Sequence, residues 1–173
     1  SVYTEGVLGS SFGFLEQGET SESIAIFASI DYHLSQQLTL TVGARYFEDD
    51  RAIDGNFYTA PKNATFDHVS PAIGASYALT NDASIYFRIA EGFRSGGFNS
   101  LSGAEDYLPE TVRTYEVGAK ASMLEGRLQT EAALFYSQYE DIQASDSSRQ
   151  VIGRAVTINP GEAEMQGIEW SAQ

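Results

Sequence analysis

The chain has 173 residues, and its 24 acidic against 10 basic residues give a net charge of −14. A broad nucleic-acid-binding surface is not expected, since such a surface must neutralise phosphates with basic side chains, and the absence of cysteine excludes disulfides and thiolate zinc sites. Ten Tyr, ten Phe and 16 Gly favour strands and turns.

The first residues carry neither a basic n-region nor an apolar h-region, so no signal peptide is expected. Because the sequence opens within an apparent strand near 2–8, we interpret it as a fragment or a processed form. No uncharged apolar run approaches the roughly 20 residues that a membrane-spanning helix needs.

Apolar and polar residues alternate along six segments of the chain. Between Leu38 and Tyr46 the even positions are apolar, and the odd positions are Thr, Gly or Arg. This period of two indicates strands with one apolar and one polar face. The segments are 24–32, 38–46, 69–79, 83–90, 114–121 and 128–137, and strands near 2–8 and 165–172 bring the expected total to about eight.

The connections between these segments alternate in length. Short ones are expected at about 34–37, 80–82 and 124–126, and long ones at about 49–66, 94–110 and 142–155. Short turns on one rim and long loops on the other are typical of bacterial outer-membrane barrels. The apolar runs, about nine to thirteen residues long, match the ~9–11 residues of a tilted membrane strand and exceed the ~5–6 of soluble sheets.

One window also fits a helix, because apolar residues between Val117 and Tyr139 recur at spacings of three and four. Gly118 and Gly126 lie inside it, and each would cost a helix roughly 1 kcal/mol relative to Ala. We therefore predict two strands joined by a turn here.

Charged residues inside the predicted strands all fall on the polar face. On the lipid face a midplane Arg or Lys costs roughly 2–4 kcal/mol, and Asp or Glu less. The apolar face must therefore meet lipid or a dry core, and the polar face must meet water or a plug. The predicted lumen-facing charges are Arg45, Arg88, Glu116, Lys120 and Glu131, with Asp31 on the same face.

Three motifs that suggest chemistry have a simpler interpretation. The stretch from Asp67 to Ser70 contains the residue types of a catalytic triad, but neighbours in sequence cannot adopt relay geometry. The glycines of 92–97 are not followed by a helix, so we expect a flexible loop in place of a phosphate cradle. The acidic run 48–50 lacks EF-hand spacing and is expected to be a solvated loop. We expect no catalytic residue, metal site or cofactor, and no enzyme.

The long loops hold the candidates for ligand binding. Aromatic rings with polar tips can bind an aromatic or carbohydrate ligand by stacking, and an arginine can face an anion. For each single residue the simpler interpretation is a rim aromatic or loop packing. The candidates are Phe57, Tyr58, Arg94, Phe98 and Tyr107.

Four stretches together resemble the barrel of the TonB-dependent outer-membrane receptors. They are 38–46, 70–77 leading to 91–99, 109–120 continuing to 143, and 159–169, and their order and spacing match the family from about Ser23 onward.

The resemblance implies an all-β, antiparallel transmembrane barrel of 22 strands whose lumen holds a plug. It also implies active uptake of a scarce large solute, often a ferric siderophore, powered through TonB. Residues 1–173 would all belong to the barrel domain, without the plug and the C-terminal strands. The implied location is the bacterial outer membrane, and the implied partners are its lipid, the plug, the remaining strands, TonB and the solute.

Two alternatives from other classes stay open. One is a self-contained outer-membrane barrel of about eight strands with a structural or adhesin role. The other is a soluble carbohydrate-binding β-sandwich, which predicts that the face carrying Ile24, Ile26 and Ile30 is buried.

Overall fold

The computed structural model describes residues 2–3, 17–55, 60–99, 105–151 and 154–173, and all its regular elements are strands. None of these residues belongs to a helix long and apolar enough to cross a membrane. The strands are β1 (Val2–Tyr3), β2 (Gln17–His33), β3 (Leu38–Gly55), β4 (Lys62–Ala78), β5 (Ala83–Arg94), β6 (Glu110–Met123), β7 (Leu128–Glu140), β8 (Ala144–Val151), β9 (Arg154–Ile158) and β10 (Ala163–Ala172).

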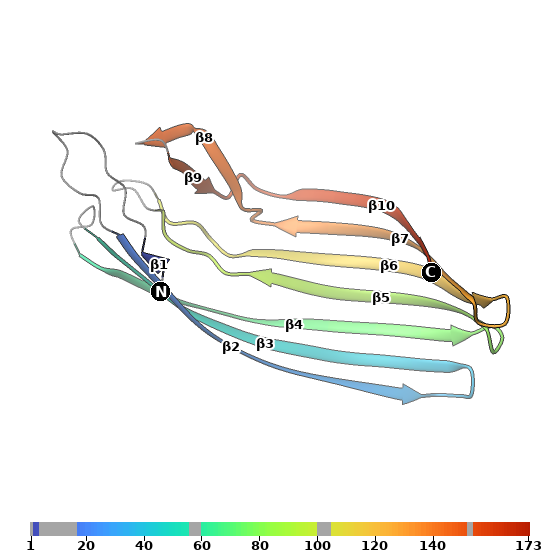
Figure 1. Cartoon of the computed structure of the whole chain (residues 1–173). Helices are drawn as coiled ribbons and strands as arrows, with labels where there is room; N and C mark the ends of the chain where they lie inside the picture. Colours follow the sequence, from blue (N-terminus) through green and yellow to red (C-terminus); the bar gives the residue numbers. More distant parts are fainter. Residues whose placement is uncertain (1, 4–16, 56–59, 100–104, 152–153) are drawn as a thin grey trace.

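Eight strands form one antiparallel sheet in the order β1-β2-β3-β4-β5-β6-β7-β10, which confirms the predicted fold class and strand number. The strands lie side by side, with short turns at one end and the loops and the separate β8–β9 hairpin at the other (Figure 1). The sheet is open, with β1 and β10 at its edges. The described residues therefore do not form a small closed barrel.

The window that also fitted a helix forms β6 and β7, as predicted. The turn between them places Leu124, Glu125 and Gly126 at φ values of 54°, 60° and 85°. Three consecutive residues with positive φ reverse the chain abruptly, which a continuing helix does not permit.

The registers preserve the predicted faces across the sheet. Ile30 lies opposite Val42, Val42 opposite Ile73, and Ile73 opposite Ile89. The apolar face is open: Ile30 is 71% exposed and Val42 60% exposed. Because a β-sandwich would bury this face, the soluble-sandwich alternative is wrong.

Two predicted long connections are wrong in part. Residues 49–55 and 62–66 continue β3 and β4, and residues 144–158 contain the β8–β9 hairpin. These stretches are rich in charged and polar side chains, so their sequence shows no clear alternation of apolar and polar residues. Ile53, 1% exposed, lies on the same face as Asp49, so the extension of β3 does have a buried side.

The pairing between β4 and β5 stops half-way, at Ala72 opposite Ala90, although β4 stays paired with β3 as far as Lys62. Figure 1 shows β4 and β5 diverging from there towards the loop end. The next residue of β4 is Pro71, which has no N–H to donate to a ladder. The end of β5 is thereby free to separate from β4, while it stays paired with β6 as far as Arg94.

Candidate functional site

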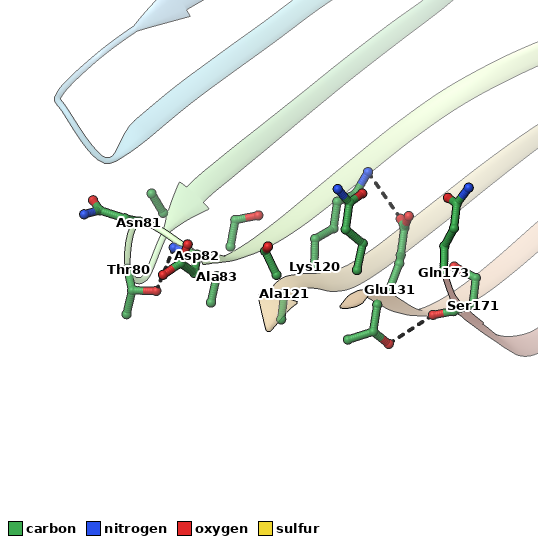
Figure 2. A pocket seen from close by; sticks show the side chains of 14 residues that line it. Thr80, Asn81, Asp82, Ala83, Lys120, Ala121, Glu131, Ser171 and Gln173 are labelled. Carbon is green, nitrogen blue, oxygen red and sulfur yellow. Dashed lines mark hydrogen bonds and ion pairs between the residues drawn. The ribbon is translucent and has the colours of Figure 1, made fainter. Parts of the chain in front are cut away.

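The polar face carries all five charges that the sequence placed there. Arg88 lies opposite Glu116, and Lys120 opposite Glu131, on the same face as Arg45. Lys120 Nζ is 3.4 Å from Glu131 Oε1. These two side chains border a hollow of about 440 Å³ at the turn end of the sheet, where Figure 2 shows them pointing toward one another.

Tyr86 joins three strands on this face, a role that the sequence did not indicate. Its ring lies over Gly118, and its hydroxyl donates to Glu131 Oε1 at 2.8 Å. Lys120 Nζ lies 5.1 Å from the centre of the same ring. β5, β6 and β7 are thus tied together by one aromatic side chain.

A second hollow, of about 610 Å³, lies on the polar face between β2 and β5. Small residues such as Gly43 and Gly74 line it, together with Arg45 and Arg88. The Arg45 guanidinium carbon is 5.0 Å from the centre of the Phe47 ring. No ion pair found within the described ranges involves Arg45 or Arg88.

At the loop end, the segment after β5 folds onto the polar face of β3 and β4. Residues 95–99 are all buried. The expectation of a flexible loop over 92–97 is therefore wrong, because residues 92–94 belong to β5 and residues 95–97 are buried. A methyl group at Gly96 would lie 2.7 Å from the Phe66 ring and 2.6 Å from the Tyr107 carbonyl oxygen. Only glycine permits this close approach. We call residues 95–99 and 105–109 the inward loop.

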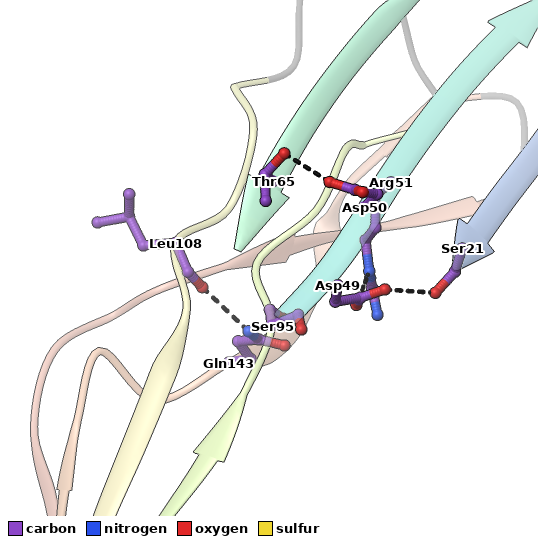
Figure 3. Close-up of polar contacts among 8 residues, drawn as sticks. All are labelled: Ser21, Asp49, Asp50, Arg51, Thr65, Ser95, Leu108 and Gln143. Atoms are coloured by element: carbon purple, nitrogen blue, oxygen red, sulfur yellow. Dashed lines mark hydrogen bonds and ion pairs between the residues drawn. The ribbon is translucent and has the colours of Figure 1, made fainter. Parts of the chain in front are cut away.

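Asp49, 2% exposed, is the polar centre beneath the inward loop (Figure 3). Ser21 Oγ donates to its carboxylate at 2.6 Å, and Arg51 Nε donates at 2.7 Å. Burial alone would raise the Asp49 pKa, but the hydrogen bonds from Ser21, Arg51 and Ser95 outweigh burial and lower it. Burial likewise opposes the charge of Arg51, while Asp49 raises the Arg51 pKa above its ordinary value. Both residues lie in the part of β3 beyond its apolar stretch.

Side-chain amides connect the inward loop to β9 and to the residues that flank the β8–β9 hairpin. Asn99, 6% exposed, accepts from the Thr157 N–H and donates to the Thr157 carbonyl oxygen, both at 2.8 Å. Gln143 donates to the carbonyl oxygens of Ser95 at 2.9 Å and Leu108 at 3.0 Å. Asn159 accepts from the Leu108 N–H at 2.7 Å. The loop and the β8–β9 hairpin are therefore one connected unit.

The predicted ligand candidates occupy different environments. Arg94 is exposed, Tyr107 is half-buried and Phe98 is only 8% exposed. Gly97 and Tyr107 exchange two backbone hydrogen bonds of 3.0 Å, which hold the two arms of the inward loop together. Phe57 and Tyr58 lie outside the described residues. The expectation of a solvated loop over the acidic run 48–50 is wrong for Asp49, because it lies in β3 and is buried. The sequence missed Asn99 and Gln143, because their partners Thr157 and Ser95 are far away along the chain.

His68 belongs to a structural cluster at the point where β4 and β5 separate. Its Nε2 lies 2.8 Å from Glu91 Oε1, and Glu91 also accepts from Arg113 at 2.7 Å. The His68 ring stacks on Phe93 at 4.7 Å. Asp67, its neighbour in a strand, points to the other face. Among the described residues no group of three His, Asp or Glu is placed to hold a metal ion.

Comparisons with known proteins agree with this architecture. Residues 3–173 match the family model described as "TonB dependent receptor-like, beta-barrel". The pesticin receptor of Yersinia enterocolitica is 27% identical over 164 residues, which are 89% of this chain and 24% of the receptor. The ferric-pyoverdine 358 receptor of Pseudomonas putida is 29% identical over 153 residues, covering 83% of this chain and 18% of that receptor.

Solved structures show the same fold. The ferric yersiniabactin uptake receptor FyuA from Yersinia pestis aligns with a TM-score of 0.76 and 24% identity over 92% of this chain and 25% of that chain. The alcaligin outer-membrane receptor FauA from Bordetella pertussis aligns with a TM-score of 0.67 and 21% identity, covering 91% and 28%. The chain spans about a quarter of the length of the curated relatives that it matches first. It belongs to the β-barrel family of the TonB-dependent receptors, which are outer-membrane proteins.

Proposed function

We propose that the protein containing this chain takes up a scarce large solute of the ferric-siderophore class across the outer membrane, powered through TonB. The observation that carries this proposal is the match of residues 3–173 to the receptor barrel. Relatives and structural neighbours named as receptors for ferric yersiniabactin, alcaligin and ferric pyoverdine support the solute class. The activity is transport, with no chemical conversion of the solute.

In this proposal residues 1–173 form part of the barrel wall, and the plug and the remaining strands come from the rest of the protein. The exposed apolar face meets lipid hydrocarbon, where apolar side chains are favourable. The polar face, with Arg45, Arg88, Glu116, Lys120 and Glu131, meets the aqueous lumen and the plug.

The inward loop contributes to the ligand-binding mouth. It covers the polar face of β3 and β4 at the loop end, so it narrows the entrance to the barrel lumen on that side. Arg94 is exposed beside it and can contact an anionic solute, and Tyr107, Phe57, Tyr58 and Phe98 supply aromatic contacts. Phe98 is the weakest candidate, because its ring is already covered.

Uptake of radioactive iron tests the proposal. The full-length protein is expressed in cells that lack their own siderophore receptors, and ferric yersiniabactin, ferric alcaligin and ferric pyoverdine are supplied separately. We expect accumulation of iron with at least one of them, only when TonB is present. Equal accumulation with and without the protein, or with and without TonB, would contradict the proposal.

A further inference from the structure

The directions of the backbone N–H and C=O groups along β4 identify which of these groups have no neighbouring strand beyond Pro71 among the described residues. The Ala78 N–H donates to the Gln37 carbonyl oxygen beside β3, and the Leu79 N–H donates to the Ala83 carbonyl oxygen beside β5. N–H groups alternate in direction along a strand, and the β3–β4 register has no irregularity. Odd-numbered residues of β4 therefore direct their N–H and C=O groups away from β3.

Pro71 is odd-numbered, so its missing N–H falls at the next hydrogen-bonding position of the β4–β5 ladder. Beyond it, Asn63, Thr65 and Asp67 direct their backbone groups toward the side that β5 has left. Of the described strands, only β3 pairs with this part of β4. We call the backbone of residues 63–67 on this side the open edge.

The inward loop does not cover the open edge, because it passes across the polar face of the sheet. Its Ser95 reaches the carboxylate of Asp49 on β3, and its Gly96 lies against the Phe66 ring. Asn63, Thr65 and Asp67 all have exposed side chains. Unpaired strand edges of this kind are templates for pairing with another strand.

The face beside the open edge is acidic. In the registers Glu22 lies opposite Asp50, and Glu48 lies opposite Asp67. Like charges directly opposite each other destabilise a sheet. The basic residues of this region, Arg51 and Lys62, belong to the alternate positions and point to the other face. A positively charged partner on this face would relieve the repulsion between these carboxylates.

We propose that the open edge binds an extended segment of another protein by strand addition, with basic side chains on the acidic face. The backbone groups of residues 63, 65 and 67 supply the ladder hydrogen bonds, which give affinity for any extended chain. Asp67, with Asp50 and Glu48 one strand further, selects lysine or arginine at alternate positions of the added strand.

The test uses the full-length protein and an eight-residue peptide of alternating valine and lysine, with a valine and glutamate peptide as the charge control. Thr65→Pro removes one N–H of the open edge, whereas Thr65→Val keeps it. Both variants lose the Thr65 hydroxyl that donates to Asp50 at 2.6 Å, so the loss of this hydrogen bond does not distinguish them. We expect Thr65→Pro to weaken binding of the lysine peptide about ten-fold relative to Thr65→Val.

A second variant changes Pro71, which lies in β4 outside the open edge. Pro71→Val restores the N–H, so that β5 can extend its pairing with β4, and we expect weaker peptide binding. Equal affinities for the two peptides, equal affinities for Thr65→Pro and Thr65→Val, or an unchanged affinity in Pro71→Val would each overturn the proposal. Ferric-siderophore uptake is measured separately, so failure here is distinguishable from failure of the proposed transport function.

Discussion

The ring of Tyr86 occupies the space above Gly118, where a methyl group would lie 2.6 Å from the ring atoms and the hydroxyl oxygen. The glycine allows the ring to cross β6 and to place its hydroxyl on Glu131 of β7. Gly167 and Phe135 repeat the arrangement on the next pair of strands, where a methyl group would lie 2.7 Å from the ring. Glycines on the polar face thus make room for aromatic side chains from the neighbouring strand.

Gly118→Ala should destabilise the full-length protein by about 1–3 kcal/mol, because the added methyl group forces the Tyr86 ring away from Glu131. Denaturant unfolding in detergent micelles measures the change. In a Tyr86→Ala background the same substitution should cost little, because the obstructing ring is gone. Equal costs in both backgrounds would show that the ring is not responsible.

Val42→Arg should impair assembly in membranes, while Thr41→Arg should be tolerated. Val42 is 60% exposed on the apolar face, where arginine costs roughly 2–4 kcal/mol in lipid. Thr41 lies on the polar face and donates to Asp31 at 2.7 Å, so an arginine there gains a carboxylate partner. The yield of folded protein in lipid vesicles is the measurement. Similar yields for the two variants would reverse the assignment of the faces.

The attachment of the inward loop should weaken in acid. The Asp49 pKa is lowered in the folded protein, so the stabilisation is present above the unfolded-state pKa and is lost as the pH falls through the folded-state value. Protection of the backbone amides of residues 95–99, measured as the exchange rate relative to the intrinsic rate at the same pH, should therefore fall below about pH 4. Asp49→Asn should remove this pH dependence, and a loss of protection of the same size in that variant would place its origin elsewhere.

Asn99→Ala should separate the inward loop from the β8–β9 hairpin. It leaves the Thr157 N–H and carbonyl group without their side-chain partner, and such a loss costs about 1–3 kcal/mol locally. Faster hydrogen exchange at Thr157 is the expected signal. Ser148→Ala is the matched control, because it removes a hydrogen bond to Asp146 that stays within the hairpin. If exchange at Thr157 is unchanged in Asn99→Ala, the two segments are not coupled through this amide.

Arg94→Gln should weaken binding of an anionic ferric siderophore about ten-fold, as expected when a charged hydrogen-bonding group facing a ligand is removed. Arg127→Gln, at the exposed turn on the other rim, should leave affinity unchanged. Equilibrium titration of the full-length protein with the ferric siderophore that it transports measures both. An equal loss in the two variants would indicate a general effect of charge on the ligand.

The faces of the strands could be predicted because they depend on local chemistry. Alternation from Leu38 to Tyr46 or from Ala83 to Ala90 needs only a period of two, and the short turns predicted at about 34–37 and 124–126 follow from chain reversal between such segments. The five charges predicted to face the lumen all occupy polar positions of their strands, so their common face was predictable as well: Arg45, Arg88, Glu116, Lys120 and Glu131.

The arrangement at the loop end depended on tertiary structure. Pro71 is plain in the sequence, but its effect requires the register, which decides that its missing N–H faces β5. Asp49 meets Ser95, and Asn99 meets Thr157, only because the chain between them folds back over the sheet. Local periodicity therefore determined the wall of strands, whereas contacts between distant residues decided how the inward loop covers it, because no short stretch of sequence contains both partners.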